Sequence, residues 1–327
     1  MKISVELATR TKSLEWTETV LFAVINVVAF FGNFLTCYAV YRNHRLRTLT
    51  NMFVIALGVS DILMSTLCIP FTVVTLFHGH WMFGKSFCRF HGFGVLTFEM
   101  VSLQTMGLIA VSRYFCVVKP EKYAVLFNKR RALLYIAVVW CVALVGSVPP
   151  FLSKINRFEF QPGKAMCLCT FESNIAYTVV IECVYVAAPF IIITICYAKV
   201  FCTVSKANRL LSNANDLQQL RTNVKEAIVT KTLAAVMVGF TCCWLPVSVM
   251  DNIDAASGEH TFPRPAYITY AFLAYLSSTI NPFIYAATNM QLRREYQKIL
   301  SKAIPCFRWD LAKRQDSKLC VIGVFHP

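Results

Sequence analysis

The sequence predicts an all-α membrane protein, a bundle of seven transmembrane helices followed by a short amphipathic helix. Composition is the first observation behind this prediction, because 57% of the 327 residues are hydrophobic and only 15% are charged. Such a chain is too apolar for an ordinary soluble domain. Apolar runs are the second, since a helix needs about 20 apolar residues to cross the hydrocarbon core of a bilayer. Seven such runs occur, near residues 18–41, 51–76, 89–118, 132–152, 175–201, 227–250 and 266–288.

The distribution of Lys and Arg is the third observation, and it predicts the orientation. Most of the 32 basic residues fall in the connections that follow the odd-numbered runs and in the C-terminal tail. Cytoplasmic loops carry an excess of Lys and Arg, so these connections should be cytoplasmic and the N-terminus extracellular. We therefore expect a multi-pass protein of the plasma membrane. Its parts would be a short extracellular N-terminus over residues 1–17, the seven-helix domain over 18–288, the amphipathic helix over 289–305 and a cytoplasmic tail over 306–327.

The net charge of +15 follows from the same loops. Because it is divided among short segments that flank the membrane helices, it favours attraction to anionic inner-leaflet lipid and argues against a nucleic-acid partner. The sequence contains no recognisable nucleophile–base pair, metal cluster or phosphate-binding loop. We therefore do not expect an enzyme.

Three of the predicted helices carry distinctive motifs. The seventh ends in Asn281-Pro282-Phe283-Ile284-Tyr285, where a proline inside the membrane requires neighbouring helices to satisfy the freed backbone groups. The third ends in Ser112-Arg113-Tyr114. In the sixth, Phe240, Trp244, Val247 and Asp251 recur at helical spacing and share one face, and Pro246 allows a kink there.

Together these motifs resemble those of class A (rhodopsin-like) G-protein-coupled receptors, and the resemblance covers about residues 18–305. It implies a small extracellular ligand bound among the outer halves of helices three, five, six and seven. It also implies a cytoplasmic cleft that opens for a heterotrimeric G protein, with arrestin as a further partner. The switch and coupling residues that it implies are Ser112, Arg113, Tyr114, Tyr197, Glu226, Phe240, Asn281, Pro282 and Tyr285.

Arg113 and Glu226 match the ion pair that restrains helices three and six in resting receptors of this family. Ser112 replaces the acidic residue that normally precedes the arginine, so we expect weaker restraint and some ligand-independent activity. The alternative is that Arg113 is a solvated arginine at the membrane edge.

An intramembrane carboxylate is expensive, at roughly 2.5–3.5 kcal/mol on insertion scales, so Asp61 should face the bundle interior. The resemblance implies an allosteric sodium ion held by Asp61 together with Ser102, Ser277 and Asn281. Neutral and anionic oxygens suit such a hard cation. A hydrogen-bonded network without a cation is the alternative.

The cysteines at the predicted extracellular face lie at the start of the third helix and in the second outer loop. A disulfide from Cys88 to that loop would form in an oxidising compartment. We expect Cys169 as its partner, because Cys169 leads directly into the fifth helix, and Cys167 is the alternative. Cys306 follows the amphipathic helix and is either a palmitoylation site or unmodified.

The ligand pocket is predicted from residues that face the bundle in its outer half. Glu99 could pair with a ligand ammonium group; the alternative is that it is protonated or bonded internally. Tyr275 stands where opsins carry the retinal-linking lysine, so no retinal is expected. The full predicted set is Val95, Glu99, Glu182, Tyr185, Trp244, Val247, Ser248, Asp251 and Tyr275.

Within class A, two local segments, around Cys169-Thr170-Phe171 and Phe272-Leu273-Ala274-Tyr275, resemble melatonin receptors. This resemblance implies an orphan melatonin-receptor-like protein that couples to the inhibitory G protein. Tyr185 departs from it, because melatonin receptors carry a histidine there, and an acidic pocket suits a neutral ligand poorly. A receptor for a cationic amine or small peptide is the alternative within the family. A seven-span transporter and a photoreceptor are the alternatives of other kinds.

Overall fold

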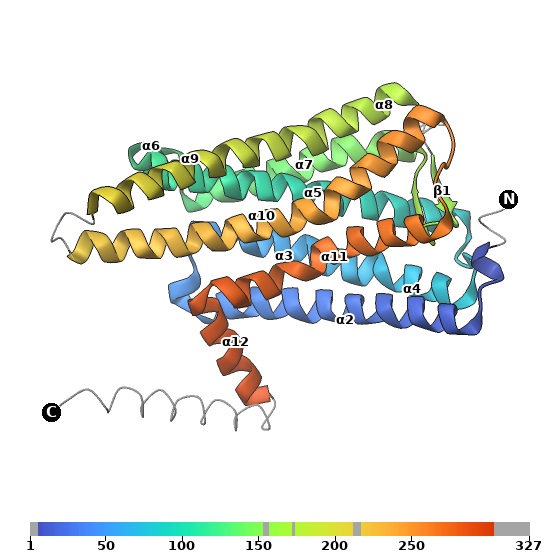
Figure 1. Ribbon diagram of the computed structural model, residues 1–327, viewed down its shortest axis with the longest axis horizontal. Coiled ribbons are helices and arrows are strands. Elements are labelled where there is room, and N and C mark those ends of the chain that lie inside the picture. The colour runs from blue at the N-terminus through green and yellow to red at the C-terminus, as the bar shows by residue number, and fades with distance from the viewer. Residues whose placement is uncertain (1–5, 153–156, 172–173, 212–216, 304–327) are drawn as a thin grey trace.

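The structure, a computed structural model, describes residues 6–152, 157–171, 174–211 and 217–303, except for the side chains of 207–211, 217–233, 236, 288 and 303. The chain folds into an elongated bundle of seven membrane-length segments (Figure 1). The predicted fold class, an all-α seven-helix bundle, is confirmed. The segments are α2 (Lys12–Arg42), α3 with α4 (Leu49–Leu67 and Ile69–His78), α5 (Gly84–Val118), α7 (Lys129–Leu152), α8 with η3 and α9 (Ile175–Val180, Ile181–Ala187 and Ala188–Leu211), α10 (Leu217–Ser257) and α11 (Arg264–Thr288).

Short elements join the long helices at both ends of the bundle. Within the described residues, the only sheet is an antiparallel hairpin that lies at the N-terminal end in Figure 1, whereas α12 follows α11 at the other end and turns away from the bundle. The short elements are η1 (His44–Leu46), α6 (Pro120–Leu126), β1 (Phe158–Gln161), β2 (Met166–Cys169) and α12 (Met290–Ala303).

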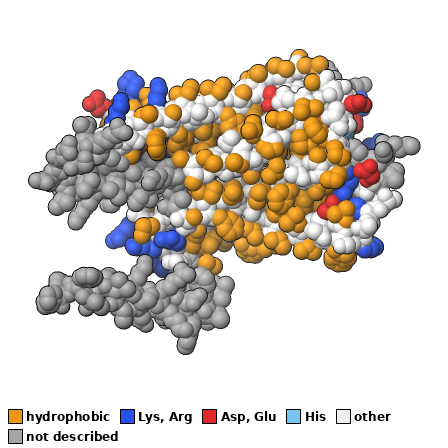
Figure 2. Space-filling model, viewed as in Figure 1, with side chains coloured by type: hydrophobic (Ala, Val, Ile, Leu, Met, Phe, Trp, Pro, Cys, Tyr) orange, Lys and Arg blue, Asp and Glu red, His pale blue; other side chains and the backbone are white. Residues whose placement is uncertain are grey.

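The outer surface of the bundle is apolar. Among the described residues, five of the seven segments are long and apolar enough to cross a membrane by length and composition. Figure 2 shows hydrophobic side chains along the visible face of the bundle, with charged side chains gathered near its ends. Large apolar side chains such as Phe31, Leu133 and Ile191 are more than half exposed, as lipid-facing residues would be.

Two proline-bearing segments depart from regular α-helix near the hairpin end. The second span breaks at Cys68, and Pro70 lies in the first turn of α4, where its missing N–H leaves no helical bond unmade. In the fifth span, Pro189 cannot donate to the carbonyl of Tyr185, and the turn before it widens into the π-helical stretch η3. Glu182 and Tyr185 both lie on this widened turn.

Pro282 sits inside α11 and removes the N–H that would bond the carbonyl of Ser278. The Nδ2 group of Asn33 on α2 donates to that carbonyl at 2.9 Å and also to its own helix at Ala29. Gly32 allows this approach, because a Cβ there would lie 2.9 Å from the ring of Pro282. A neighbouring helix thus satisfies the backbone group that the proline leaves unpaired.

A disulfide ties the hairpin to the start of α5. It joins Cys88 to Cys167, with their Cα atoms 5.4 Å apart, so the predicted partner Cys169 was wrong and the alternative Cys167 is right. Cys169 is on the same face of β2 but two residues further along, or about 6.6 Å, which places its sulfur out of reach of Cys88. Cys169 is instead buried outside the bridge, packed beside Ile181 and Tyr185.

Replacing Asn33 by Ala should leave the Ser278 carbonyl without its donor and destabilise the fold by about 1 kcal/mol. The measurement is the thermal unfolding midpoint of the purified protein in detergent. In a Pro282→Ala background residue 282 regains an N–H that can bond Ser278, so Asn33→Ala should then have a smaller effect. An equal loss in both backgrounds would contradict this role of Asn33.

Replacing Cys167 by Ser should break the bridge, which closes a sequence separation of 79 residues, and destabilise the protein by about 2–4 kcal/mol. The matched control Cys169→Ser should keep the bridge. Mass spectrometry of non-reduced peptides would identify the partner of Cys88 in each variant. Recovery of Cys88 linked to Cys169 in the wild type would refute the pairing.

Candidate functional site

A cavity of about 40 Å³ lies beneath the hairpin, among α5, η3, α10 and α11. This volume holds only a few water molecules, because each needs roughly 10–15 Å³ by the same measure. The hairpin closes the cavity from above through Leu168 and Cys169. The lining residues are Leu96, Glu99, Met100, Leu103, Leu168, Cys169, Phe171, Ile181, Glu182, Tyr185, Val186, Trp244, Ser248, Asp251 and Tyr270.

Three carboxylates from three different elements line this cavity. Glu99 comes from α5, Glu182 from η3 and Asp251 from α10. Carboxylates gathered in a largely apolar enclosure repel one another unless a cation or a proton balances them. The cavity is therefore built to hold positive charge.

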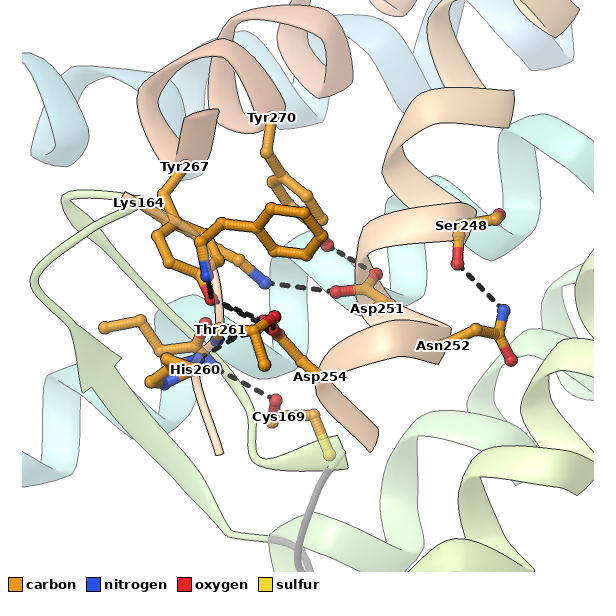
Figure 3. A network of polar contacts seen from close by, with 12 residues as sticks. Lys164, Cys169, Ser248, Asp251, Asn252, Asp254, His260, Thr261, Tyr267 and Tyr270 are labelled. Carbon is orange, nitrogen blue, oxygen red and sulfur yellow. Dashed lines mark hydrogen bonds and ion pairs between the residues drawn. The ribbon is translucent and has the colours of Figure 1, made fainter. Parts of the chain in front are cut away.

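One cation is already present, and it comes from the hairpin turn. The ammonium group of Lys164 lies 3.1 Å from Oδ1 of Asp251, and only 3% of its side chain is exposed. The same nitrogen lies 3.8 Å from the centre of the Tyr270 ring, while the Tyr270 hydroxyl donates to Oδ2 of Asp251 at 2.8 Å. Figure 3 shows that Lys164, from the hairpin turn, and Tyr270, from α11, both point toward Asp251.

A second aspartate of α10, Asp254, follows Asp251 by one helical turn and fixes the connection to α11. Its Oδ2 accepts a hydrogen bond of 2.8 Å from the Tyr267 hydroxyl. Its Oδ1 accepts from the backbone and hydroxyl of Thr261 at 3.0 and 2.9 Å, and His260 lies at 3.4 Å (Figure 3). This network is structural, because its members bind one another.

Most of the predicted pocket residues line the cavity, and the remainder lie behind its wall. Val95, Val247 and Tyr275 are at most 1% exposed and do not line the cavity. The Tyr275 hydroxyl is bonded to Thr72 at 2.9 Å, so it links α11 to α4 instead. The predicted residues that line the cavity are Glu99, Glu182, Tyr185, Trp244, Ser248 and Asp251.

Lys164 and Tyr270 are site residues that the sequence analysis missed. Tyr270 lies five residues, or about 500° of helical rotation, before Tyr275 and so faces a different side of α11. The Pro162-Gly163 pair before Lys164 is a turn signal. That signal locates the turn in the sequence but does not predict where the turn lies relative to the helix bundle.

The floor of the cavity is formed by Trp244 and Leu103. Trp244 stacks on Phe240 one turn deeper, with ring centroids 5.7 Å apart. Phe240 and Leu103 belong to the same buried core, and Pro189 packs against α5 beside Gly107. A displacement at the floor can therefore pass through close-packed side chains toward the end of the bundle where α12 lies.

Deeper in the bundle, Asn281 donates to Oδ2 of Asp61 at 2.9 Å. The other carboxylate oxygen of Asp61 and the amide oxygen of Asn281 are buried and lack a hydrogen-bond donor among the described residues. Ser102 is bonded to Ser60 at 2.9 Å, and Ser277 donates within its own helix. Two unpaired buried oxygens beside hydroxyl groups are a donor set that suits a hard cation such as sodium.

At the other end of α5, Arg113 is 4% exposed and Ser112 is fully buried. The hydroxyls of Tyr197 and Tyr285 are buried there without a hydrogen-bond partner in the described part of the chain. Tyr114 lies under the ammonium group of Lys199, 5.7 Å from its ring centre. The side chain of Glu226 and all of Cys306 lie outside the described residues, so the Arg113 ion pair and the lipidation site stay predictions.

Comparison with known proteins supports a receptor. Residues 32–285 match the family described as "7 transmembrane receptor (rhodopsin family)". Melatonin receptor type 1B of Rattus norvegicus is 29% identical over 297 residues, which cover 89% of this chain and 80% of the relative. The histamine H2 receptor of Homo sapiens is also 29% identical, over 304 residues that cover 92% and 82% of the two chains. The likeness to melatonin receptors therefore extends over most of the chain, and the expectation that it is confined to two local segments was wrong.

Among solved structures, the crystal structure of squid rhodopsin aligns with a TM-score of 0.80 and covers 94% of this chain and 91% of its own. At 21% identity, this likeness concerns the fold.

If a sodium ion binds between Asp61 and Asn281, NaCl should raise the thermal unfolding midpoint of the wild type more than choline chloride at equal ionic strength. Asp61→Asn should remove that difference, because the substitution deletes the anionic ligand and keeps the shape. Ser65→Ala, four residues along the same helix, is a control that should keep the difference. Equal effects of the two salts on the wild type would contradict the sodium site.

Proposed function

The chain belongs to the rhodopsin family of seven-transmembrane receptors, and on that premise we propose that it detects a small organic cation outside the cell. As a class A G-protein-coupled receptor it is a multi-pass membrane protein and not an enzyme. The observation that carries the proposal is the acidic cavity. Glu99, Glu182 and Asp251 line it, and Lys164 forms an ion pair with Asp251.

The chemistry of the cavity favours a ligand with an ammonium group. Pairing an ammonium ion with a buried carboxylate offsets the desolvation of both charges. Glu99 is the best placed partner, because it lies deeper than Asp251 on the adjacent helix and interacts electrostatically with both Asp251 and Lys164. Phe171, Tyr185 and Trp244 supply apolar and aromatic surface for the body of the ligand.

A neutral, melatonin-like ligand is the second candidate, and similarity of sequence is what favours it. The two kinds of relative are named for melatonin and for histamine at the same identity. Their names alone therefore do not separate the candidates. Glu99 and Glu182 do, since Lys164 pairs with Asp251 and a neutral ligand would bring no charge to balance the other two carboxylates.

Ligand binding would shift an equilibrium between inactive and active arrangements. Trp244 at the cavity floor would pass the change to Phe240 and so to the cytoplasmic half of α10. Arg113 would then be released from Glu226 to meet the G protein, with Asn281, Pro282 and Tyr285 rearranging in α11. Ser112 in place of an acid would lower the barrier and give ligand-independent activity.

The finer assignments rest on similarity and on loop charge. The inhibitory class of G protein and arrestin are proposed partners by analogy with the melatonin receptors. The plasma membrane, with an extracellular N-terminus, is the proposed location, because Lys and Arg gather in the connections at the end where α12 lies. The hairpin and the Cys88–Cys167 disulfide would then face the oxidising exterior.

The proposal is tested by G-protein activation in transfected cells with a panel of biogenic amines and melatonin. Glu99→Gln should raise the concentration of amine needed for half-maximal response by about 10- to 100-fold, as expected for the loss of a charged hydrogen bond. Glu159→Gln makes the same chemical change at an exposed position of the hairpin and should have little effect. Arg113→Ala should abolish signalling while surface expression persists.

Activation by melatonin alone, with the same potency in Glu99→Gln, would reject the cationic ligand in favour of the second candidate. A signal that survives Arg113→Ala would reject the proposed coupling through α5.

A further inference from the structure

The side chain of Lys164 is placed as a ligand would be. Its ammonium group has a carboxylate on one side, at 3.1 Å, and the face of an aromatic ring on the other, at 3.8 Å. Carboxylates and aromatic faces are what proteins use to bind alkylammonium groups. Tyr270 and Asp251, which form this seat, both line the cavity, whereas Lys164 reaches it from a turn of the hairpin.

The conformation of the hairpin turn positions the Lys164 side chain. Gly163 lies against Tyr267, where an added Cβ would come within 2.8 Å of the ring, so only glycine fits without displacement of the turn. Ala165 adopts a positive φ of 53°, which is uncommon for a residue with a side chain. The disulfide at Cys167 then fixes the base of the turn to α5.

The space left around Lys164 is small. With the lysine in place, about 40 Å³ remains, which is too little for a ligand of several heavy atoms. With Lys164 in place, the cavity therefore lacks the volume for an external ligand. The negative charges of Glu99 and Glu182 are still to be balanced.

We propose that Lys164 is an intramolecular ligand of this receptor, whose ammonium group occupies the cation seat between Asp251 and Tyr270, so that an external cation binds by displacing it. This inference rests on the proposed function in that both require a cavity selective for cations. The tether gives Lys164 a high effective concentration at the seat. The apparent affinity of an external cation is accordingly reduced by the fraction of molecules in which Lys164 is bound.

The test uses n-butylammonium, which reproduces the end of the lysine side chain, and the full-length purified receptor. In Lys164→Ala the vacated seat should bind the probe, and the thermal unfolding midpoint should rise by about 2–4 °C at ten times the dissociation constant. At the same concentration the wild type should show a clearly smaller rise, because the probe has to displace Lys164. Neutral n-butanol should stabilise neither protein, and Asp251→Asn added to Lys164→Ala should remove the response.

Equal responses of the wild type and Lys164→Ala, or a response that survives Asp251→Asn, would overturn the proposal. Lys164→Met guards against misfolding, because it keeps the length of the stem and removes only the charge. In that variant methylammonium should fill the position of the missing ammonium group and raise the midpoint. Absence of a rise with Lys164→Met, if this variant folds, would equally overturn the proposal.

The binding test does not depend on signalling, so the two proposals fail separately. Butylammonium binding to Lys164→Ala without amine-induced signalling in any variant would keep the intramolecular ligand and reject the amine receptor. Amine signalling with the same potency in the wild type and Lys164→Ala would keep the receptor and reject the intramolecular ligand.

Discussion

The hydrogen bond from Asn33 to the Ser278 carbonyl is the contact on which the arrangement of the last helix depends. Pro282 leaves that carbonyl without a donor from its own helix, and inside a membrane-spanning bundle a neighbouring helix commonly supplies one. The close approach of α2 to α11 answers this need and sets the rotation of α11. That rotation in turn places Asn281 beside Asp61 and, three turns further out, Tyr270 beside the cavity.

The same requirement, that buried polar groups have partners, also determines the contacts at the hairpin end of the molecule. Glu18 on α2 is held there between two arginines, with contacts of 2.5 Å to Arg10 and 2.6 Å to Arg264. Asp251 is held between Lys164 and Tyr270. Each acid bridges segments far apart in the sequence, so ion pairs hold the helices together at the hairpin end of the bundle.

Much of the fold was predictable because the membrane leaves few options for apolar runs of this length. Helical spacing predicted that Glu99, Trp244 and Asp251 face the bundle interior, and the structure places all three in the cavity wall; their role in ligand binding stays a prediction. Val95, Val247 and Tyr275 are buried and do not line the cavity, whose wall instead includes the π-helical turn and the hairpin residues Leu168 and Cys169. Helical spacing in the sequence predicts neither the π-helical turn nor the position of the hairpin.

The loop was the least predictable part. Both of its cysteines were candidates for the bridge, and only the register of β1 against β2 selects Cys167. That register also decides where Lys164 lies, and it depends on a turn conformation and a contact with Tyr267 from the far end of the chain. In a binding experiment, this loop would affect the rates of association and dissociation as well as the affinity. The hairpin lines the cavity and is tied to α5 by the disulfide and to α10 by the Lys164–Asp251 ion pair, so we expect the lifetime of that ion pair to limit how fast a ligand enters or leaves past the hairpin.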